Sequence, residues 1–130
     1  MNIGQASKQS GISAKMIRYY EQIGLLDTAK RSLAGYRIYT EQDIKTLVFL
    51  RHARDLGFYS DQMKELLSLW KNTGRQSAEV KQLTLQHIDT LNEKIAQLQD
   101  MVNWLQESAD HCAGDSQADC TILKNIEQGK

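Results

Sequence analysis

Residues 3–26 read IGQASKQSGISAKMIRYYEQIGLL and decide the fold of this 130-residue chain. A short helical pattern is interrupted at Gly11, because glycine breaks helices and supplies tight turns. Ser13 is then placed to cap a second helix, which ends near Gly24. Two short helices joined across a glycine-containing turn predict a helix-turn-helix over about residues 3–23.

The second of these helices has an exposed polar face that carries Lys15, Arg18 and Tyr19. Such side chains donate hydrogen bonds to phosphates or stack on bases when a helix lies on DNA. On an isolated helix they would more often be solvated surface. DNA becomes the better interpretation only when a second basic element accompanies them.

Residues 30–39, KRSLAGYRIY, supply that second element. Side chains alternate after Gly35, which predicts a small β-hairpin, the wing. Thr40 and Asp43 are then spaced to form a capping pair for a helix that stops at Gly57.

A further helix follows, for which Ser60 is the expected cap and Gly74 lies beyond the end. Trp70 is expected on its buried side, together with Met63, Leu66 and Leu67. These elements predict a mainly α protein whose residues 1–75 form a winged helix-turn-helix DNA-binding domain.

Residues 76–110 predict one long helix that begins at Ser77. Apolar residues recur along it in alternating steps of three and four: Ile88, Leu91, Ile95, Leu98, Val102, Leu105 and Ala109. This heptad seam favours a two-stranded coiled coil. About 48 Å of helix is too long for a small domain to cover, so the seam predicts a homodimer. Packing within one chain is the alternative.

Residues 111–130 form a predicted metal-binding loop and tail that contain the only two cysteines, Cys112 and Cys120. Two thiolates can hold a soft monovalent ion in line, but they cannot complete the four-ligand cage of structural zinc. Other interpretations are two unrelated thiols, a disulfide, or a zinc site completed by three nearby side chains: His111, Asp115 and Asp119.

Charge divides the chain, although its formal net charge is zero. Residues 1–75 hold 12 Lys and Arg against 7 Asp and Glu, whereas residues 76–130 hold 4 against 9. A basic first half suits a polyanion such as DNA. No apolar run is long enough to span a membrane, and the first residues lack a secretory pattern, so a cytoplasmic location with reduced thiols is expected.

Several strings of the chain together resemble the MerR family of bacterial metal-responsive regulators. They are MIRYYE at 16–21, GYRIY at 35–39, LRHARDLGF at 50–58, the long helix and the C-x7-C loop. Within that family the chain is most similar to the copper-responsive CueR group.

The resemblance implies a transcriptional activator that binds promoter DNA as a homodimer, together with RNA polymerase, and distorts the duplex when metal binds. It implies Cu(I), or Ag(I) or Au(I), as the ion and copper efflux or detoxification genes as targets. Sensors of divalent ions carry a third cysteine at the start of the long helix, where this chain has Ser77. The implied DNA contacts are Lys15, Arg18, Tyr19, Tyr36 and Arg37, with Arg31 and Arg54 as phosphate clamps.

Three positions depart from the family pattern, which often has proline there: Asp27, Ala113 and Thr121. Ala113 and Thr121 should make the metal-free loop less rigid, because proline restricts the chain. Two rival functions use the same thiols: a redox-switch transcription factor with a Cys112–Cys120 disulfide, and a copper-buffering protein. An enzyme is not expected, because no acid, base and nucleophile cluster together in the pattern.

Overall fold

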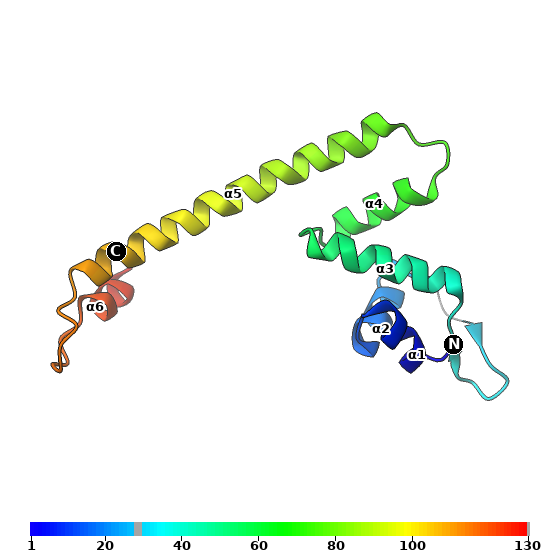
Figure 1. Cartoon of the computed structure of the whole chain (residues 1–130), viewed down its shortest axis with the longest axis horizontal. Coiled ribbons are helices and arrows are strands. Elements are labelled where there is room, and N and C mark those ends of the chain that lie inside the picture. Colours follow the sequence, from blue (N-terminus) through cyan, green and yellow to red (C-terminus); the bar gives the residue numbers. More distant parts are fainter. Residues whose placement is uncertain (28–29, 130) are drawn as a thin grey trace. The chain divides into compact units, whose positions relative to one another are not determined.

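The computed structural model describes residues 1–27 and 30–129 and divides into two compact units, Met1–Thr84 and Leu85–Lys130. The first unit contains α1 (Ile3–Ser10), α2 (Ala14–Gln22), β1 (Lys30–Arg31), β2 (Arg37–Ile38), α3 (Glu41–Asp55) and α4 (Ser60–Lys71) (Figure 1). Helix α5 (Ser77–Asp110) begins in this unit and ends in the second, which also contains α6 (Thr121–Gln128). The predicted mainly helical fold is confirmed.

Capping contacts explain why α1 and α2 are separate helices. Asn2 Oδ1 accepts from the Gln5 N–H at 2.8 Å, and the Gln5 side chain accepts from the Asn2 N–H at 3.0 Å. Helix α1 then ends at Gly11, whose φ is +76°. Ser13 Oγ accepts from the Met16 N–H at 3.2 Å, so the predicted cap of α2 is confirmed.

Gly11 is the position at which this turn most needs glycine. Besides its positive φ, a Cβ added there would collide with the Arg51 guanidinium. We expect Gly11→Ala to destabilise the protein by about 1–2 kcal/mol, the cost of a left-handed conformation for an L-residue. Gly4→Ala is the matched control, because Gly4 lies within α1 and has space for a Cβ. Chemical denaturation should find Gly4→Ala neutral or stabilising, and a Gly11→Ala variant as stable as wild type would contradict the expectation.

The core of the first unit draws on α1, α2, α3 and α4, and α1 packs against both α2 and α3. Its fully buried members are Ala6, Ile17, Leu47 and Leu50, each with 0% exposure. Tyr20 is also buried, on the inward face of α2, whereas Met16 is only partly buried at the edge. Burial of this face leaves the polar face of α2 outward.

The wing forms as predicted, but its strands are only two residues each. They pair antiparallel, with Lys30 opposite Ile38 and Arg31 opposite Arg37. At the tip, the Ser32 N–H donates to the Tyr36 carbonyl at 2.7 Å. The turn passes through Gly35 with φ +86°.

At α3 and α4 one prediction is confirmed and two are corrected. Thr40 and Asp43 form the predicted capping box, with bonds of 2.9 and 3.1 Å. Ser60 is the first residue of α4 rather than its cap, which is Tyr59, so that prediction was wrong by one position. Trp70 is 37% exposed instead of buried, because it stacks on Phe49 from outside the core, with ring centroids 4.2 Å apart.

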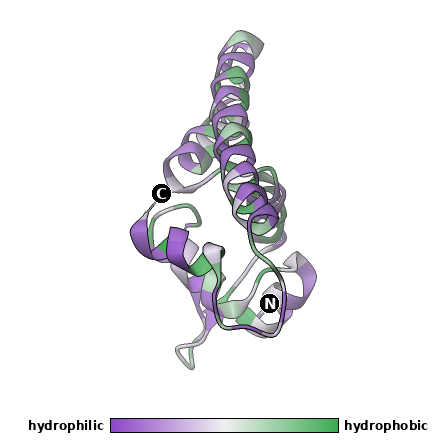
Figure 2. Cartoon of the chain, turned by 90° about the vertical axis from the view of Figure 1, so that its left-hand side faces the viewer, coloured by the Kyte–Doolittle hydropathy of each residue, from purple (hydrophilic) through white to green (hydrophobic). Residues whose placement is uncertain are grey.

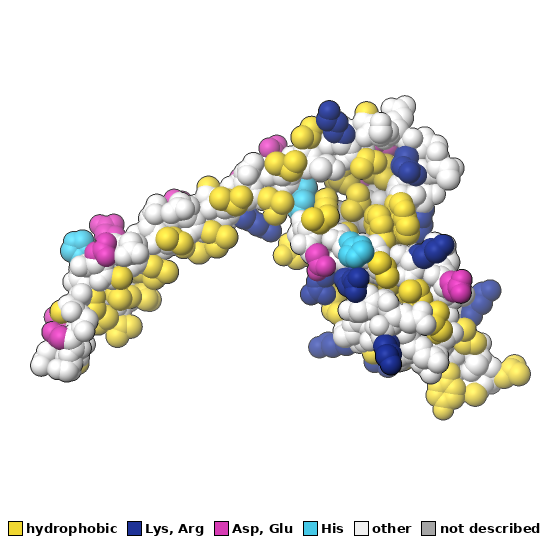
Figure 3. Space-filling model, viewed as in Figure 1, with side chains coloured by type: hydrophobic (Ala, Val, Ile, Leu, Met, Phe, Trp, Pro, Cys, Tyr) yellow, Lys and Arg dark blue, Asp and Glu magenta, His cyan; other side chains and the backbone are white. Residues whose placement is uncertain are grey.

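Helix α5 presents the predicted seam as an exposed apolar stripe in the single chain. Hydrophobic and hydrophilic residues alternate along it (Figure 2), and hydrophobic side chains line one side of it in Figure 3. Ile95, Leu98, Val102 and Leu105 are each more than half exposed. Over the described residues, none of the helices combines the length and apolar character needed to cross a membrane.

Residues 111–130 were predicted as a metal-binding loop and tail, with no helix assigned, and within them residues Thr121–Gln128 form α6. Ile122 and Ile126 lie four residues apart, and the helix ends at Gly129 with φ +70°. This spacing of apolar residues and the terminal glycine were the available signal. The helix matters because it begins directly after a cysteine.

Candidate metal centre and nucleic-acid interface

The two cysteines lie close together at the end of α5. Cys112 follows the last residue of α5, Asp110, by two positions, and Cys120 is the N-cap of α6. Their Sγ atoms are 3.9 Å apart, both side chains are partly buried, and both thiols are free. The loop between them therefore brings together the two cysteines that the sequence predicted as metal ligands.

The distance between the sulfurs suits a reduced pair that can take up one ion. Two thiolates in line with an ion lie about 4.6 Å apart if each metal–sulfur bond is about 2.3 Å, the value for zinc thiolates. The observed 3.9 Å is within 1 Å of that separation. A disulfide requires about 2.05 Å, so closing one needs a larger movement of the loop.

The N-terminus of α6 faces Cys120. Backbone N–H groups, chiefly that of Leu123, lower the pKa of the Cys120 thiol; burial opposes this, and the Cys112 side chain and the Ile122 N–H assist it. Hydrogen bonds to the charged form stabilise a thiolate. The same N–H groups favour the net negative charge of two thiolates with a monovalent ion. No sequence pattern predicted this contribution, because α6 itself was not predicted.

The three side chains considered for a zinc site are engaged elsewhere. His111 Nδ1 lies 2.7 Å from the Glu107 carbonyl, Asp115 accepts from the Gln117 N–H at 2.9 Å, and Asp119 pairs with Lys124 at 2.9 Å. Over residues 1–27 and 30–129, no three His, Cys, Asp or Glu side chains gather in a group that could hold a metal. Within the described chain, this arrangement suits two-coordinate binding better than zinc.

Ser77 begins α5, whereas Cys112 follows the end of the same helix. A helix of 34 residues extends about 51 Å. Ser77 can therefore act on the sulfurs only from a second copy of the chain. Its predicted role in metal selectivity stays a prediction.

Two side-chain bonds tie α6 to the end of α5. Thr121 Oγ1 donates to the His111 carbonyl at 3.3 Å, and Asn125 Nδ2 donates to the buried Ser108 Oγ at 3.0 Å. Thr121 is the first residue of α6, a position where proline is favoured in helices. Proline would restrict the backbone here but has no hydroxyl to donate to the His111 carbonyl. Thr121 gives up that restriction and forms the hydrogen bond instead.

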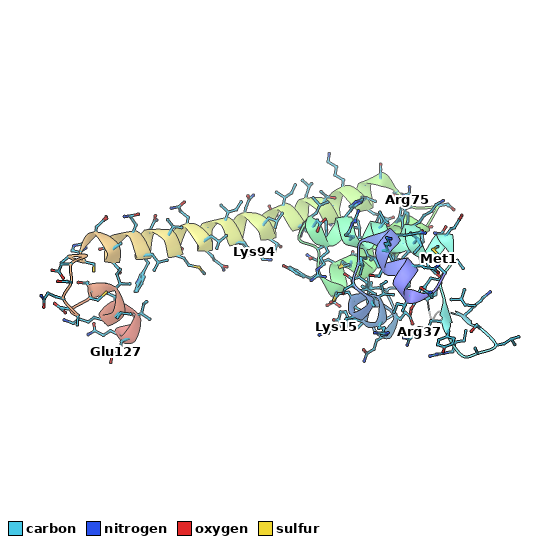
Figure 4. All side chains as sticks on the ribbon, turned by 60° about the horizontal axis from the view of Figure 1, so that its bottom comes forward. Met1, Lys15, Arg37, Arg75, Lys94 and Glu127 are labelled. Carbon is cyan, nitrogen blue, oxygen red and sulfur yellow. The ribbon has the colours of Figure 1, made fainter. Side chains whose placement is uncertain are left out.

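The residues predicted to contact DNA are distributed over α2, the wing and α3. Lys15, Arg18 and Tyr19 are exposed on α2, as are Arg31 and Tyr36 in the wing and Arg54 in the last turn of α3. Arg37 is half-buried, with its side chain 33% exposed. Lys15 and Arg37 are labelled in Figure 4, where the side chains of α2 and the wing project from the first unit.

Arginines from α2 and the wing converge on two adjoining hollows. One, of about 200 Å³, is lined by Arg18, Arg31, Arg37 and Tyr36 among others. The other, of about 370 Å³, is lined by Arg18, Arg37, Glu21 and Gln22. The structure thus brings four of the predicted residues together, whereas Lys15, Tyr19 and Arg54 line neither hollow.

Glu21 is the residue of this surface that the sequence analysis missed. Its carboxylate pairs with Arg37 Nε at 3.4 Å and accepts a hydrogen bond from the Tyr39 hydroxyl. Burial, then the hydrogen bond and the charge of Glu21, raise the pKa of Tyr39 above its ordinary value. Tyr39 therefore stays a neutral donor at physiological pH.

Comparison with known proteins places this architecture in a family. Residues 2–39 match the family model described as MerR family regulatory protein, and residues 44–107 match the model described as MerR, DNA binding. The HTH-type transcriptional regulator HmrR of Sinorhizobium medicae is 53% identical over 129 residues, which covers 99% of this chain and 88% of that protein. The HTH-type transcriptional regulator CueR of Escherichia coli O6:H1 is 41% identical over 126 residues, covering 97% and 93%.

A solved structure agrees with these matches. The transcription regulator PbrR691 from Ralstonia metallidurans CH34, in complex with lead(II), superposes with a TM-score of 0.80 at 28% identity and covers 97% of this chain and 98% of that one. These relatives are transcription regulators rather than enzymes, as expected. From the two family models and the near full-length relatives, we conclude that this chain belongs to the MerR family of DNA-binding transcriptional regulators.

Proposed function

We propose that this chain is a homodimeric transcriptional activator that responds to Cu(I), with Ag(I) and Au(I) as alternative ions, through Cys112 and Cys120. The observation that carries the proposal is the pair of sulfurs 3.9 Å apart, with no third His, Asp or Glu ligand gathered around them among the described residues. A bound ion of +1 charge supplies a linear link between the two thiolates. The similarity to CueR supports the same choice of ion.

The residues around the pair suit a complex that is negatively charged overall. Cys120 receives N–H groups from α6, chiefly from Leu123. Ser77 of a partner subunit would bring the N-terminus of its α5, which favours negative charge in the same way, and would supply no third sulfur. Coordination number selects against Zn(II), which takes four ligands. Hg(II) also accepts two thiolates in line, so charge must select against it: its complex would be neutral, whereas the surroundings favour a negative one.

DNA would be bound by α2 and the wing of each protomer. Lys15, Arg18 and Tyr19 lie on α2, and Arg31, Tyr36 and Arg37 lie in or beside the wing. Arg54 would add a phosphate contact. Metal capture would favour one shape of the dimer, which bends and untwists the promoter so that RNA polymerase can use it. In this proposal the targets are copper efflux or detoxification genes and the protein acts in the cytoplasm.

Transcription from a cognate promoter with purified polymerase tests the choice of ion. Cu(I), Ag(I), Au(I), Zn(II) and Hg(II) are added separately under reducing conditions. We expect induction by the three monovalent ions and none by the two divalent ions. Equal induction by Zn(II) would refute selection by coordination number, and equal induction by Hg(II) would refute selection by charge.

A thiol redox switch is the second candidate, favoured by the proximity of the sulfurs and by the lowered pKa of Cys120. It requires an oxidant that removes two electrons and two protons as the disulfide forms. Oxidant added to metal-free protein distinguishes the candidates. Induction that reductant reverses would favour the redox switch, whereas no response would favour metal sensing.

A further inference from the structure

A buried carboxylate joins α2, the helix that we propose binds DNA, to the wing. Glu21 lies in the last turn of α2, and its side chain is only 7% exposed. One oxygen accepts from the Tyr39 hydroxyl, and the other pairs with Arg37 Nε at 3.4 Å. Burial of a carboxylate is costly unless it is hydrogen-bonded and paired, and Glu21 is both.

Both partners of Glu21 come from the same side of the wing. Arg37 lies in β2, and Tyr39, which is 1% exposed, follows that strand into the core. The two-stranded sheet is too short to define the direction of the wing by itself. Backbone bonds between Tyr39 and Met1 hold its base, and Glu21 adds a side-chain link to α2.

The link also determines how Arg37 can act. Pairing at Nε leaves the two terminal nitrogens of the guanidinium for another acceptor, because arginine carries five donors. Arg37 lines the same two hollows as Arg18, which lies one turn before Glu21 on α2. The carboxylate thus holds the Arg37 guanidinium at the hollows that Arg18 also lines, and it neutralises part of the positive charge there.

We propose that Glu21 is a positioning residue for DNA binding. Through Tyr39 and Arg37 it fixes the orientation of the wing relative to α2. Its negative charge also weakens the nonspecific attraction of this surface to phosphates, which favours recognition of the operator. The inference rests on the DNA-binding part of the proposed function and is independent of metal. A released Arg37 would add a mobile phosphate contact that every DNA sequence offers. Discrimination between DNA sequences would then fall although attraction to DNA rose.

The test compares operator and nonspecific duplexes over a series of salt concentrations, using the full-length protein. Glu21→Gln keeps the shape and an acceptor for Tyr39 but removes the charge that pairs with Arg37. We expect nonspecific binding to tighten, the salt slope to steepen by about 0.9 per protomer, and the ratio of operator to nonspecific affinity to fall about tenfold. If Glu21 only stabilised the fold, the variant would bind both the operator and the nonspecific duplex more weakly, and its salt slope would be shallower.

Three further variants make the result specific. Glu21→Asp keeps the charge and should restore most of the wild-type salt slope. Tyr39→Phe should lower the affinity ratio with little change in slope, and its effect should be non-additive with Glu21→Gln. Glu65→Gln, on the exposed surface of α4, changes the net charge equally and should leave the affinity ratio unchanged.

Amide hydrogen exchange of residues 30–39 in DNA-free protein separates this inference from the proposed function. We expect several-fold faster exchange in Glu21→Gln and Tyr39→Phe, because each variant removes one of the two side-chain contacts between the wing and α2. Wild-type protein that does not prefer its operator would refute the DNA-binding function, whereas unchanged exchange in both variants would overturn the positioning role. An unchanged slope and affinity ratio in Glu21→Gln would also overturn it.

Discussion

Replacing either Cys112 or Cys120 with serine should abolish metal-induced transcription while leaving operator binding nearly intact. One remaining thiolate cannot hold an ion in line with a second sulfur, and serine is a poor ligand for soft ions. A switch that moves a dimer from 1:99 to 99:1 needs a preference of about 5.5 kcal/mol for one shape. Loss of either sulfur removes that preference, so transcription should stay at the metal-free level at every Cu(I) concentration.

Ser116→Ala is the matched control for both cysteine variants. It lies in the same loop, is exposed, and should leave induction unchanged. Operator titration without metal completes the experiment, because α2 and the wing belong to the unit Met1–Thr84 and the cysteines to the other. A parallel loss of DNA binding in the cysteine variants would contradict a dedicated metal switch. Induction that survives in either variant would assign the response to other residues.

Leu98→Glu should separate the dimer and weaken operator binding by about 10²–10⁴-fold, the range by which linked binding exceeds single-site binding. Leu98 is 59% exposed in the single chain and occupies the middle of the seam. In a coiled coil it would be covered by the partner, where an unpaired carboxylate is strongly unfavourable. Analytical ultracentrifugation should find Leu98→Glu monomeric at concentrations at which we expect the wild type to be a dimer.

Gln97→Glu introduces the same charge next to the seam and is the control for this prediction. Gln97 is exposed and lies off the apolar stripe, so its variant should remain dimeric. Amide hydrogen exchange should find the residues of the first unit folded in both variants, since Leu98 belongs to the second unit. A Leu98→Glu protein that stays dimeric would show that the seam is covered in some other way.

Much of the fold followed from local signals in the sequence. Ser13 and the Thr40–Asp43 pair determined where α2 and α3 begin, because a cap needs only side chains within three residues of the backbone that it satisfies. The heptad seam identified the long helix for the same reason, since its period is local. Ser60 was wrong by one residue, because Tyr59 is the N-cap of α4. Trp70 was wrongly expected in the core, because its stack on Phe49 joins two helices that meet only in space.

The sequence by itself identified the two cysteines as the candidate ligands and α2 and the wing as the basic surface. It also predicted the helices α2 and α5 and the hairpin of the wing. Only the tertiary structure decided that the sulfurs lie 3.9 Å apart, that α6 directs its N–H groups at Cys120, and that Glu21 joins α2 to the wing. Each of these contacts depends on where the backbone turns between elements. Periodicity and capping act over a few residues, whereas Glu21 and Tyr39 are 18 residues apart and meet only when the core has packed.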